Sequence, residues 1–375
     1  MYQRLLITFL SLALFLGSAF GATHKKKRRR STTPAATVAV AHHARRHVAS
    51  SPWKTPTYAN STDGDSVDGE DLVVRRAAVQ ALGPYNGAVV VVDPTTGRLL
   101  TTVNQKLAFQ GSFEPCSTIK IMAALAGLSE GVIDQDSPAV RLRRRHRMNL
   151  TEALAHSNNA YFANVGEKIG YDKIVQYASM LGLGQKAGLN IDGEQPGSID
   201  PAPPSDGLGM MTSFGEGFYM TPLELAAIVT AVANGGTLYY LQHPRSEEEV
   251  NLLQPSVKRQ LNIAQWLPEI RPGMMGAVEY GTARRIGFTA DDPIFGKTGT
   301  CTDNRSPTHL GWFGSYNEVG DRKLVVVVLL TGGYGVSGPV ASGIAGNVYK
   351  NLAQENYFAR VMRLSPAALI AVPAF

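Results

Sequence analysis

The seven residues at positions 324–330 read Leu-Val-Val-Val-Val-Leu-Leu, an apolar run without a single polar interruption. A strand that exposes one face to water alternates apolar and polar residues, so a run without alternation predicts a central strand covered on both faces. The chain has 375 residues, which is enough to bury a sizeable core in one large domain or two modest ones.

Strand patterns lie at both ends of the expected folded part, and helical patterns fill roughly residues 150–285. The early strands form a hairpin signature, two β-branched runs around a Pro-Thr-Thr-Gly turn at Gly87–Val103. The late elements are expected at Ile294–Thr302, His309–Tyr316 and Lys323–Thr331, with a last helix at Gly338–Asn356. This order predicts an α+β fold: an antiparallel β-sheet flanked by helices, with an inserted mainly helical lobe and a site where lobe meets sheet.

The basic character of the chain lies in its N-terminal part. The whole chain has 36 Lys and Arg against 30 Asp and Glu, but residues 1–62 hold ten of the basic residues and no acidic one. The remainder therefore holds 26 basic and 30 acidic residues, a net charge of −4. A folded part with this charge lacks the basic surface that nucleic-acid binding requires, so we expect no nucleic-acid partner.

Two segments are expected before the folded domain. Residues 1–22 contain the apolar stretch Leu5–Ala22, which predicts a signal peptide or a membrane anchor. Residues 23–71 begin with the cations Lys25–Arg30 and continue with Ser, Thr, Ala, Pro and His, which predicts a basic, flexible tether before a domain at 72–375. We therefore expect an exported protein, in the periplasm or on the outer face of the cytoplasmic membrane, with membrane contact through residues 5–30.

A serine and a lysine three residues apart begin the helix expected at Ser117–Gly131, just after a proline. This spacing puts Ser117 and Lys120 on one face, one turn apart. A serine hydroxyl is a weak nucleophile without a base in reach, and Lys120 is a base only if burial or a nearby cation depresses its pKa. The pattern is short, and Ser51-Pro-Trp-Lys54 matches it by chance, with a proline and no helix to align the side chains.

A second short pattern is Ser157-Asn158-Asn159. From one turn, Ser157 and Asn159 can present a hydroxyl and an amide to a bound peptide. A plain helix cap or turn is the alternative interpretation of this serine. Such triplets are common, and Ser315-Tyr-Asn317 is another one, inside an expected strand.

The third pattern is Lys297-Thr298-Gly299-Thr300, inside an expected strand and followed by Cys301. Glycine in a strand interior often marks the close approach of another backbone or of a ligand. A cation and hydroxyl groups beside such a strand suit a carboxylate. The pattern therefore indicates a place where a substrate with a carboxylate could lie along the strand.

The order of the three patterns is more specific than any one of them. Ser-x-x-Lys at a helix start, then Ser-x-Asn, then Lys-Thr-Gly on a late strand is the signature set of penicillin-binding proteins and serine β-lactamases. The chain resembles this family over about residues 80–355, which implies a β-lactamase/transpeptidase-like fold. Further similar segments are Gly87–Leu100, Thr212–Gly217, Met220–Ala226, Ala233–Gly236, Val278–Ala283 and His309–Phe313.

The resemblance implies catalytic roles for five residues. Ser117 would attack the carbonyl of a penultimate D-alanine and become acylated, while Lys120 takes its proton. Ser157 would relay a proton to the leaving D-alanine with the help of Lys297, and Asn159 would bind the substrate's peptide. β-Lactams would acylate the same serine because they mimic the D-alanyl-D-alanine end.

The resemblance also implies a binding strand. The backbone N–H groups of Ser117 and Thr300 would form the oxyanion hole. Thr298, Gly299 and Thr300 would form the substrate-binding strand, in which the two threonines and Lys297 hold the terminal carboxylate. No cofactor is implied, and because the histidines form no cluster with ligand spacing, we expect no metal.

The two cysteines of the chain flank these patterns: Cys116 directly precedes Ser117, and Cys301 directly follows Thr300. Carbapenem-hydrolysing class A β-lactamases are similar at both positions, where their cysteines are bridged. By this resemblance we expect a Cys116–Cys301 disulfide in an oxidising compartment. Two buried free thiols are the alternative.

The resemblance leaves three functions open. The residues that could deacylate Ser117 distinguish the two enzymatic ones. Class A β-lactamases use a Glu in a Glu-x-x-Leu-Asn stretch, and none follows Ser157; Glu194 fits instead a Gly-Glu-x-x-Gly turn of penicillin-binding proteins. Class D enzymes have Val where Asn159 stands. We therefore expect a D,D-transpeptidase or D-alanyl-D-alanine peptidase. A serine β-lactamase is the alternative, and a non-enzymatic penicillin-binding sensor or wall-associated protein is the second alternative.

The expected partners are peptidoglycan stem peptides and β-lactam antibiotics. A protein that polymerises glycan, or one of division or elongation, is a further candidate.

Residues 22–80 leave no room for the large N-terminal domain of monofunctional penicillin-binding proteins, so we expect a stand-alone transpeptidase-like domain. The basic segment Arg141–Arg147 is expected to be a solvated loop.

Overall fold

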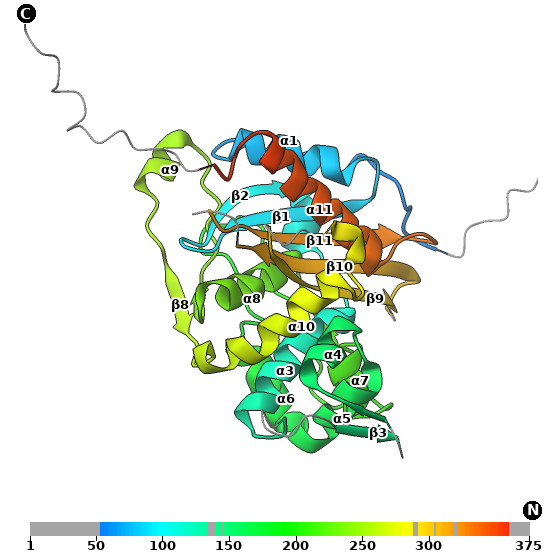
Figure 1. Ribbon diagram of the computed structural model, residues 1–375. Coiled ribbons are helices and arrows are strands. Elements are labelled where there is room, and N and C mark those ends of the chain that lie inside the picture. Colours follow the sequence, from blue (N-terminus) through cyan, green and yellow to red (C-terminus); the bar gives the residue numbers. More distant parts are fainter. Residues whose placement is uncertain are drawn as a thin grey trace, which may run out of the picture. The chain divides into compact units, whose positions relative to one another are not determined.

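The apolar run at 324–330 forms most of the central strand of a five-stranded antiparallel sheet (Figure 1). The computed structural model describes residues 53–133, 140–143, 146–287, 292–303, 305–318 and 322–359. Across the sheet the strands are β2 (Arg98–Val103), β1 (Gly87–Asp93), β11 (Val325–Gly332), β10 (Thr308–Asn317) and β9 (Ile294–Asp303). The first hairpin therefore pairs with strands from the far end of the chain, as expected, and all neighbours run antiparallel.

Helices cover both faces of the sheet. Val326, Val328 and Leu330 pack with the apolar residues of α1 (Leu72–Leu82) and α11 (Gly338–Gln354). The intervening residues of β11 face the opposite way and belong to the core that contains α8 (Pro222–Asn234). Figure 1 shows α1 and α11 on one side of the sheet and α8 on the other. The prediction of a strand covered on both faces is confirmed.

A mainly helical lobe is inserted between the two groups of strands, as the order of patterns predicted. Its helices are α3 (Lys120–Ser129), α4 (Leu150–Ala155), α5 (Asn159–Ile169), α6 (Tyr171–Met180) and α7 (Leu208–Ser213), which Figure 1 shows gathered together. The remaining elements are α2 (Gln105–Gln110), α9 (Glu247–Leu252), α10 (Leu267–Glu279), the 3-10 turns η1 (Cys116–Ile119), η2 (Ala264–Trp266) and η3 (Arg284–Ile286), and the strand pairs β3–β4 (Val140–Arg143, His146–Met148), β5–β6 (Ser198–Ile199, Phe218–Tyr219) and β7–β8 (Thr237–Tyr239, Val257–Gln260).

Local sequence signals set the ends of α8, the helix that crosses beneath the sheet. The Thr221 side chain accepts the N–H of Glu224 at 3.0 Å, and Glu224 accepts the N–H of Thr221 at 2.8 Å, which is a capping box. The helix ends at Gly235, whose φ of 93° is easily adopted only by glycine. Both ends of α8 are therefore fixed by residues within the helix or next to it.

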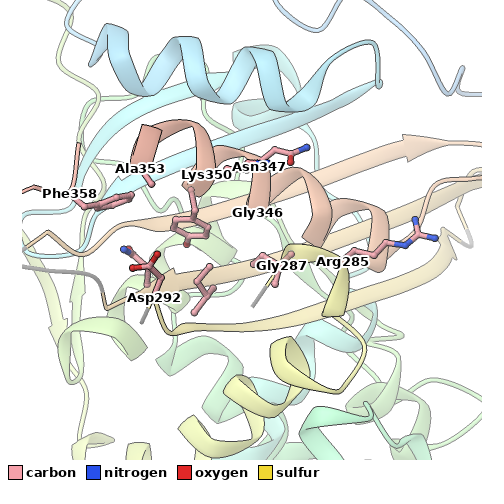
Figure 2. A pocket seen from close by; sticks show the side chains of 12 residues that line it. Arg285, Gly287, Asp292, Gly346, Asn347, Lys350, Ala353 and Phe358 are labelled. Carbon is pink, nitrogen blue, oxygen red and sulfur yellow. The ribbon is translucent and has the colours of Figure 1, made fainter. Parts of the chain in front are cut away.

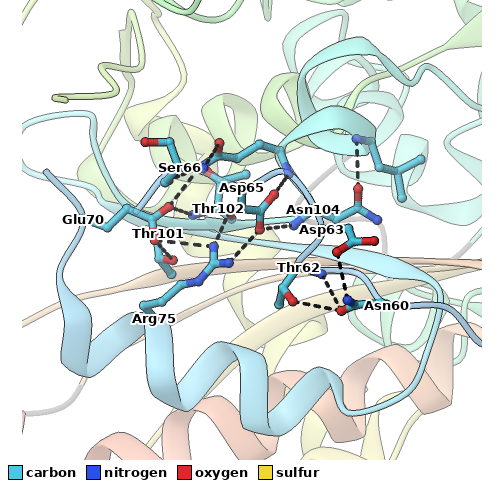
Figure 3. Close-up of polar contacts among 12 residues, drawn as sticks. Asn60, Thr62, Asp63, Asp65, Ser66, Glu70, Arg75, Thr101, Thr102 and Asn104 are labelled. Atoms are coloured by element: carbon cyan, nitrogen blue, oxygen red, sulfur yellow. Dashed lines mark hydrogen bonds and ion pairs between the residues drawn. The ribbon is translucent and has the colours of Figure 1, made fainter. Parts of the chain in front are cut away.

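The tether expected at residues 23–71 ends earlier than predicted, because residues 53–71 pack on the domain (Figure 3). The Asp65 carboxylate accepts the N–H groups of Asn104 at 2.9 Å and Gln105 at 2.7 Å, and it pairs with Arg75 at 2.7 Å. Glu70 is buried and accepts hydrogen bonds from Thr101 and Thr102. Polar contacts and the aromatic contacts of Trp53 and Tyr58 hold this segment, and neither leaves a regular apolar period in the sequence.

Several predicted features lie outside the described residues: the signal peptide or anchor at 1–22, the tether up to residue 52, and the end of the domain at 360–375. In the basic segment, expected to be a loop, residues 141–143 and 146–147 belong to the paired strands β3 and β4, while residues 144–145 and the side chains of the segment are outside the described part. Across the described ranges, no helix is long and apolar enough to cross a membrane.

Candidate active site

Ser117 lies in the 3-10 turn η1, immediately before α3, so the single helix expected from residue 117 begins as a tighter turn. This turn still places Lys120 on the same side as Ser117, and the lysine Nζ lies 3.0 Å from the serine Oγ. The Ser117 hydroxyl donates to the carbonyl of Ser213 at 3.3 Å. A nucleophile and a base therefore lie within hydrogen-bond reach, as acyl transfer requires.

The Lys120 amine is completely buried and surrounded by acceptors. Besides Ser117, the Nζ lies 2.8 Å from the carbonyl of Ser157, 3.1 Å from the Ser157 hydroxyl and 2.6 Å from Oδ1 of Asn159. Burial, followed by the charge of Lys297, lowers the Lys120 pKa to about 6. At neutral pH this amine is therefore mostly unprotonated and can accept a proton.

Ser157 lies in the turn between α4 and α5 with a φ of 54°, a left-handed conformation that is uncommon for a residue other than glycine. The cap of α5 is Asn158, whose side chain accepts the N–H of Tyr161 at 2.9 Å. The Ser157 hydroxyl is thus not used as a helix cap. It lies between two amines instead, 3.1 Å from Lys120 Nζ and 2.9 Å from Lys297 Nζ.

Lys297 lies on β9, one of the two edge strands of the five-stranded sheet, and is completely buried. Its Nζ donates to the Ser157 hydroxyl and, at 2.9 Å, to the carbonyl of Thr298. Burial lowers the Lys297 pKa to about 7. The fold thus brings two lysines, 177 positions apart in the sequence, onto one hydroxyl.

The two motif threonines of β9, Thr298 and Thr300, make separate contacts. Thr300 is exposed, and its Oγ1 accepts the N–H of Gly338 at 2.8 Å. Thr298 is 4% exposed, and its Oγ1 lies 2.6 Å from Oγ1 of Thr282. The strand can therefore present hydroxyl groups on the side of α11, whose N-terminal turn begins at Gly338.

Gly299 allows the nucleophile segment to approach β9. A Cβ at this position would lie 2.9 Å from the carbonyl oxygen of Pro115 and 3.2 Å from Cβ of Cys116. The prediction that this glycine marks a close backbone approach is confirmed, and the approaching backbone is the one just before Ser117. A larger residue here would push η1 away from the strand.

Cys116 and Cys301 form a disulfide, with their Cα atoms 5.5 Å apart. The predicted pairing is confirmed, and the alternative of two free thiols is wrong. Cys116 adopts a φ of 50°, so the bridge restrains an uncommon backbone conformation directly beside Ser117. The disulfide and Gly299 together hold the nucleophile segment against β9.

Sequence reasoning assigned no role to Ser213 or Thr282, although both lie in segments that resemble the family. Both are positioned by the fold: one touches the Ser117 hydroxyl and the other touches Thr298. Glu194, considered as a base for deacylation, is 1% exposed and accepts the N–H groups of Ala187 at 2.7 Å and Gly188 at 3.0 Å. This carboxylate therefore closes a turn, as its Gly-Glu-x-x-Gly context predicted.

A cavity of about 520 Å³ lies between the start of β9, η3 and α11, and not at Ser117 (Figure 2). Arg285, Asp292, Lys350 and Phe358 are among its lining residues, and it includes none of the motif residues. In the described part of the chain, no group of His, Cys, Asp and Glu side chains is arranged to hold a metal ion. The chemistry of the side chains, rather than cavity size, therefore locates the candidate site.

Comparison with known proteins gives consistent matches. A profile of the penicillin binding protein transpeptidase domain matches residues 87–354. Stage V sporulation protein D of Bacillus subtilis is 28% identical over 317 residues, which cover 73% of this chain and 48% of that protein. Peptidoglycan D,D-transpeptidase MrdA of Acinetobacter baumannii is 27% identical over 293 residues, which cover 61% of this chain and 43% of that protein.

The chain thus spans about half the length of the curated relatives it matches. Among solved structures, penicillin-binding protein A from M. tuberculosis, as an imipenem acyl-enzyme complex, has a TM-score of 0.61 and 22% sequence identity. The match covers 75% of this chain and 78% of that chain. The expected β-lactamase/transpeptidase-like fold is therefore confirmed.

Proposed function

The chain belongs to the penicillin binding protein transpeptidase domain family, and on that premise we propose that it is a serine acyltransferase of peptidoglycan synthesis or remodelling. Its activity is that of a D,D-transpeptidase or D-alanyl-D-alanine peptidase. The observation that carries the proposal is the 3.0 Å contact between the Ser117 hydroxyl and the buried Lys120 amine, whose pKa is lowered to about 6. The name of the Acinetobacter relative, a peptidoglycan D,D-transpeptidase, supports it.

The first step is acylation. Lys120 takes the hydroxyl proton while Ser117 Oγ bonds to the carbonyl carbon of the penultimate D-alanine of a stem peptide. The negative charge that develops on the carbonyl oxygen is stabilised by the N–H groups of Ser117 and Thr300. The closeness of η1 to β9 at Gly299 supports this assignment, because it brings the two backbones together.

The second step breaks the peptide C–N bond. Ser157 gives its proton to the leaving amine of D-alanine and is reprotonated through the two lysines, since its Oγ lies 3.1 Å from Lys120 Nζ and 2.9 Å from Lys297 Nζ. The amine of a second stem peptide, or water, then attacks the ester on Ser117 and restores the serine. Asn159, whose Oδ1 contacts Lys120, binds the substrate's peptide group.

Lys297, Thr298 and Thr300 bind the terminal carboxylate of the substrate. A cation and two hydroxyl groups on one edge strand suit this anion. β-Lactams carry a carboxylate next to a strained amide, so we propose that they acylate Ser117 as well. The solved imipenem acyl-enzyme complex of M. tuberculosis penicillin-binding protein A supports this proposal.

The reaction takes place outside the cytoplasm, in the periplasm or on the outer face of the membrane. The Cys116–Cys301 disulfide supports this location, because disulfides persist mainly in oxidising compartments. The apolar stretch at 5–22 supports export by the pattern of its residues. A glycan-polymerising or division or elongation protein is the proposed partner.

The test uses the purified protein and a fluorescent penicillin. We expect a stable adduct in the wild type, none in Ser117→Ala, and an unchanged adduct in Ser51→Ala, the control at the chance match of the same motif. Release of D-alanine from a pentapeptide, or transfer to an added D-amino acid, would establish the acyltransferase. Rapid release of hydrolysed drug would favour a β-lactamase. A stable adduct without any turnover of peptide would favour a penicillin sensor. The absence of any adduct would refute the proposal.

A further inference from the structure

Thr282 touches both of the segments that carry the candidate site's polar groups. Its backbone N–H donates to the carbonyl of Ala155 at 3.1 Å, two residues before Ser157. Its side-chain Oγ1 lies 2.6 Å from Oγ1 of Thr298. Thr282, three positions after the end of α10, therefore links the turn of Ser157 to the strand of Lys297.

The main chain of Thr282 is positioned without help from its side chain. A Cβ on the preceding Gly281 would lie 2.1 Å from the Ala155 carbonyl oxygen, so only glycine lets the two backbones meet here. The next residue, Ala283, is completely buried and donates its N–H to the carbonyl of Ala277 at 2.7 Å. A change in the Thr282 side chain should consequently leave the chain path intact.

The contact between the two hydroxyl groups has a consequence for substrate binding. A hydroxyl has one proton and two lone pairs. If Thr298 used its proton on Thr282, it could only offer lone pairs to a carboxylate, which would be repulsive. If Thr282 donates, the Thr298 proton stays free for the carboxylate, and the shared hydrogen bond makes that proton a better donor.

We propose that Thr282 is a positioning residue that donates to Thr298 and thereby directs the Thr298 hydroxyl proton at the carboxylate of substrates and β-lactams. This inference rests on the proposed function and adds a specificity determinant to it. Thr282 itself touches neither the nucleophile nor its base: its hydrogen bonds among the described residues are those to Ala155 and Thr298.

The test compares Thr282→Val, which keeps the shape and the backbone N–H but loses the hydroxyl, with Thr282→Ser, which keeps the hydroxyl. Acylation rate constants are measured with benzylpenicillin and with its methyl ester, which lacks the charge. We expect Thr282→Val to lower the rate with the acid about tenfold and to leave the rate with the ester nearly unchanged, since a hydrogen bond to a charged group is the stronger kind. Thr282→Ser should restore the preference for the acid.

A second variant pair tests whether Thr282 acts through Thr298. Thr298→Val should reduce the preference for the acid by itself, and adding Thr282→Val to it should reduce that preference no further. Equal losses with acid and ester, together with a lower thermal midpoint, would show a structural role and overturn the inference. Independent effects of the two variants would overturn it as well.

The outcomes also separate this inference from its premise. If penicillin does not acylate the wild type at Ser117, the proposed function fails and the inference fails with it. If the wild type is acylated at Ser117 but Thr282→Val keeps the full preference for the acid, only the inference fails.

Discussion

Replacing Lys297 by Met should shift the pH dependence of Ser117 acylation upwards. Lys120 can take the serine proton only when it is neutral, so the rate in the wild type should rise through a midpoint near the Lys120 pKa of about 6. Burial is the larger cause of that low pKa, and the Lys297 charge is the second. Removing this cation makes protonated Lys120 less unfavourable, so its pKa should rise.

The size of the shift follows from the positions of the two amines. Their Nζ atoms lie 3.1 and 2.9 Å from the same Ser157 Oγ, so they cannot be farther apart than the sum of these distances, 6.0 Å. Two unit charges about 6 Å apart interact by about 3 kcal/mol at an effective dielectric constant near 20, which corresponds to about 2 pKa units. Because the Lys297 pKa is about 7, this lysine is charged where Lys120 titrates.

We therefore expect Lys297→Met to have a midpoint near pH 8, and protonation alone should lower its rate at pH 7 about tenfold. The assay is the rate constant for acylation by a fluorescent penicillin between pH 5 and about pH 9.5, with the folded state checked by circular dichroism at each pH. Lys297→Arg is the matched control: it keeps the charge and should keep the midpoint near 6. A Lys297→Met midpoint that stays at the wild-type value, or an Arg variant that shifts as far as the Met variant, would refute the electrostatic reasoning.

Three further predictions concern the support of the site. The double variant Cys116→Ala/Cys301→Ala should lose up to about 5 kcal/mol of unfolding free energy, the chain-entropy value for a closed loop of 185 residues. Denaturant titration measures this loss. Reductant should destabilise the wild type and not the variant, so an equal loss in both would contradict the prediction. Gly299→Ala should lower acylation and cost about 1–3 kcal/mol, because its Cβ would lie 2.9 Å from the Pro115 oxygen; normal acylation would show that η1 can move. Thr221→Ala should cost about 1 kcal/mol through loss of the α8 cap and leave acylation unchanged, and thermal unfolding together with the penicillin assay tests both halves.

Much of the fold was predictable because the deciding signals are local. The uninterrupted run at 324–330 predicted a strand buried on both faces, and the Pro-Thr-Thr-Gly turn predicted the hairpin that pairs with it. The ends of α8 are also set locally, because the caps at Thr221 and Gly235 involve only neighbouring residues. The prediction of a tether was wrong for residues 53–71, since a segment held by buried charges such as Asp65 carries no apolar period.

The candidate site was predictable in its membership but not in its arrangement. The order of three short motifs singled out Ser117, Lys120, Ser157 and Lys297, and the structure brings these four side chains together. Their catalytic roles stay predictions until the acylation assays are done. The Ser-x-Asn motif taken alone did not distinguish a partner of two lysines from a helix cap; the order of the three motifs favoured the first, and the structure shows the two contacts.

The sequence by itself determined which residues could take part in the chemistry, because side-chain type and spacing within one helical turn are local properties. Only the tertiary structure decided that Lys120 is buried beside Lys297, which gives it a depressed pKa, and that Thr282 lies against Thr298. The closeness of Lys120 to Lys297, 177 positions away, depends on how the lobe packs on β9, and the contact of Thr282 with Thr298 depends on how the segment after α10 packs on the same strand. Burial and the distance between charges arise only from that packing, and these two quantities make the Lys120 amine a base.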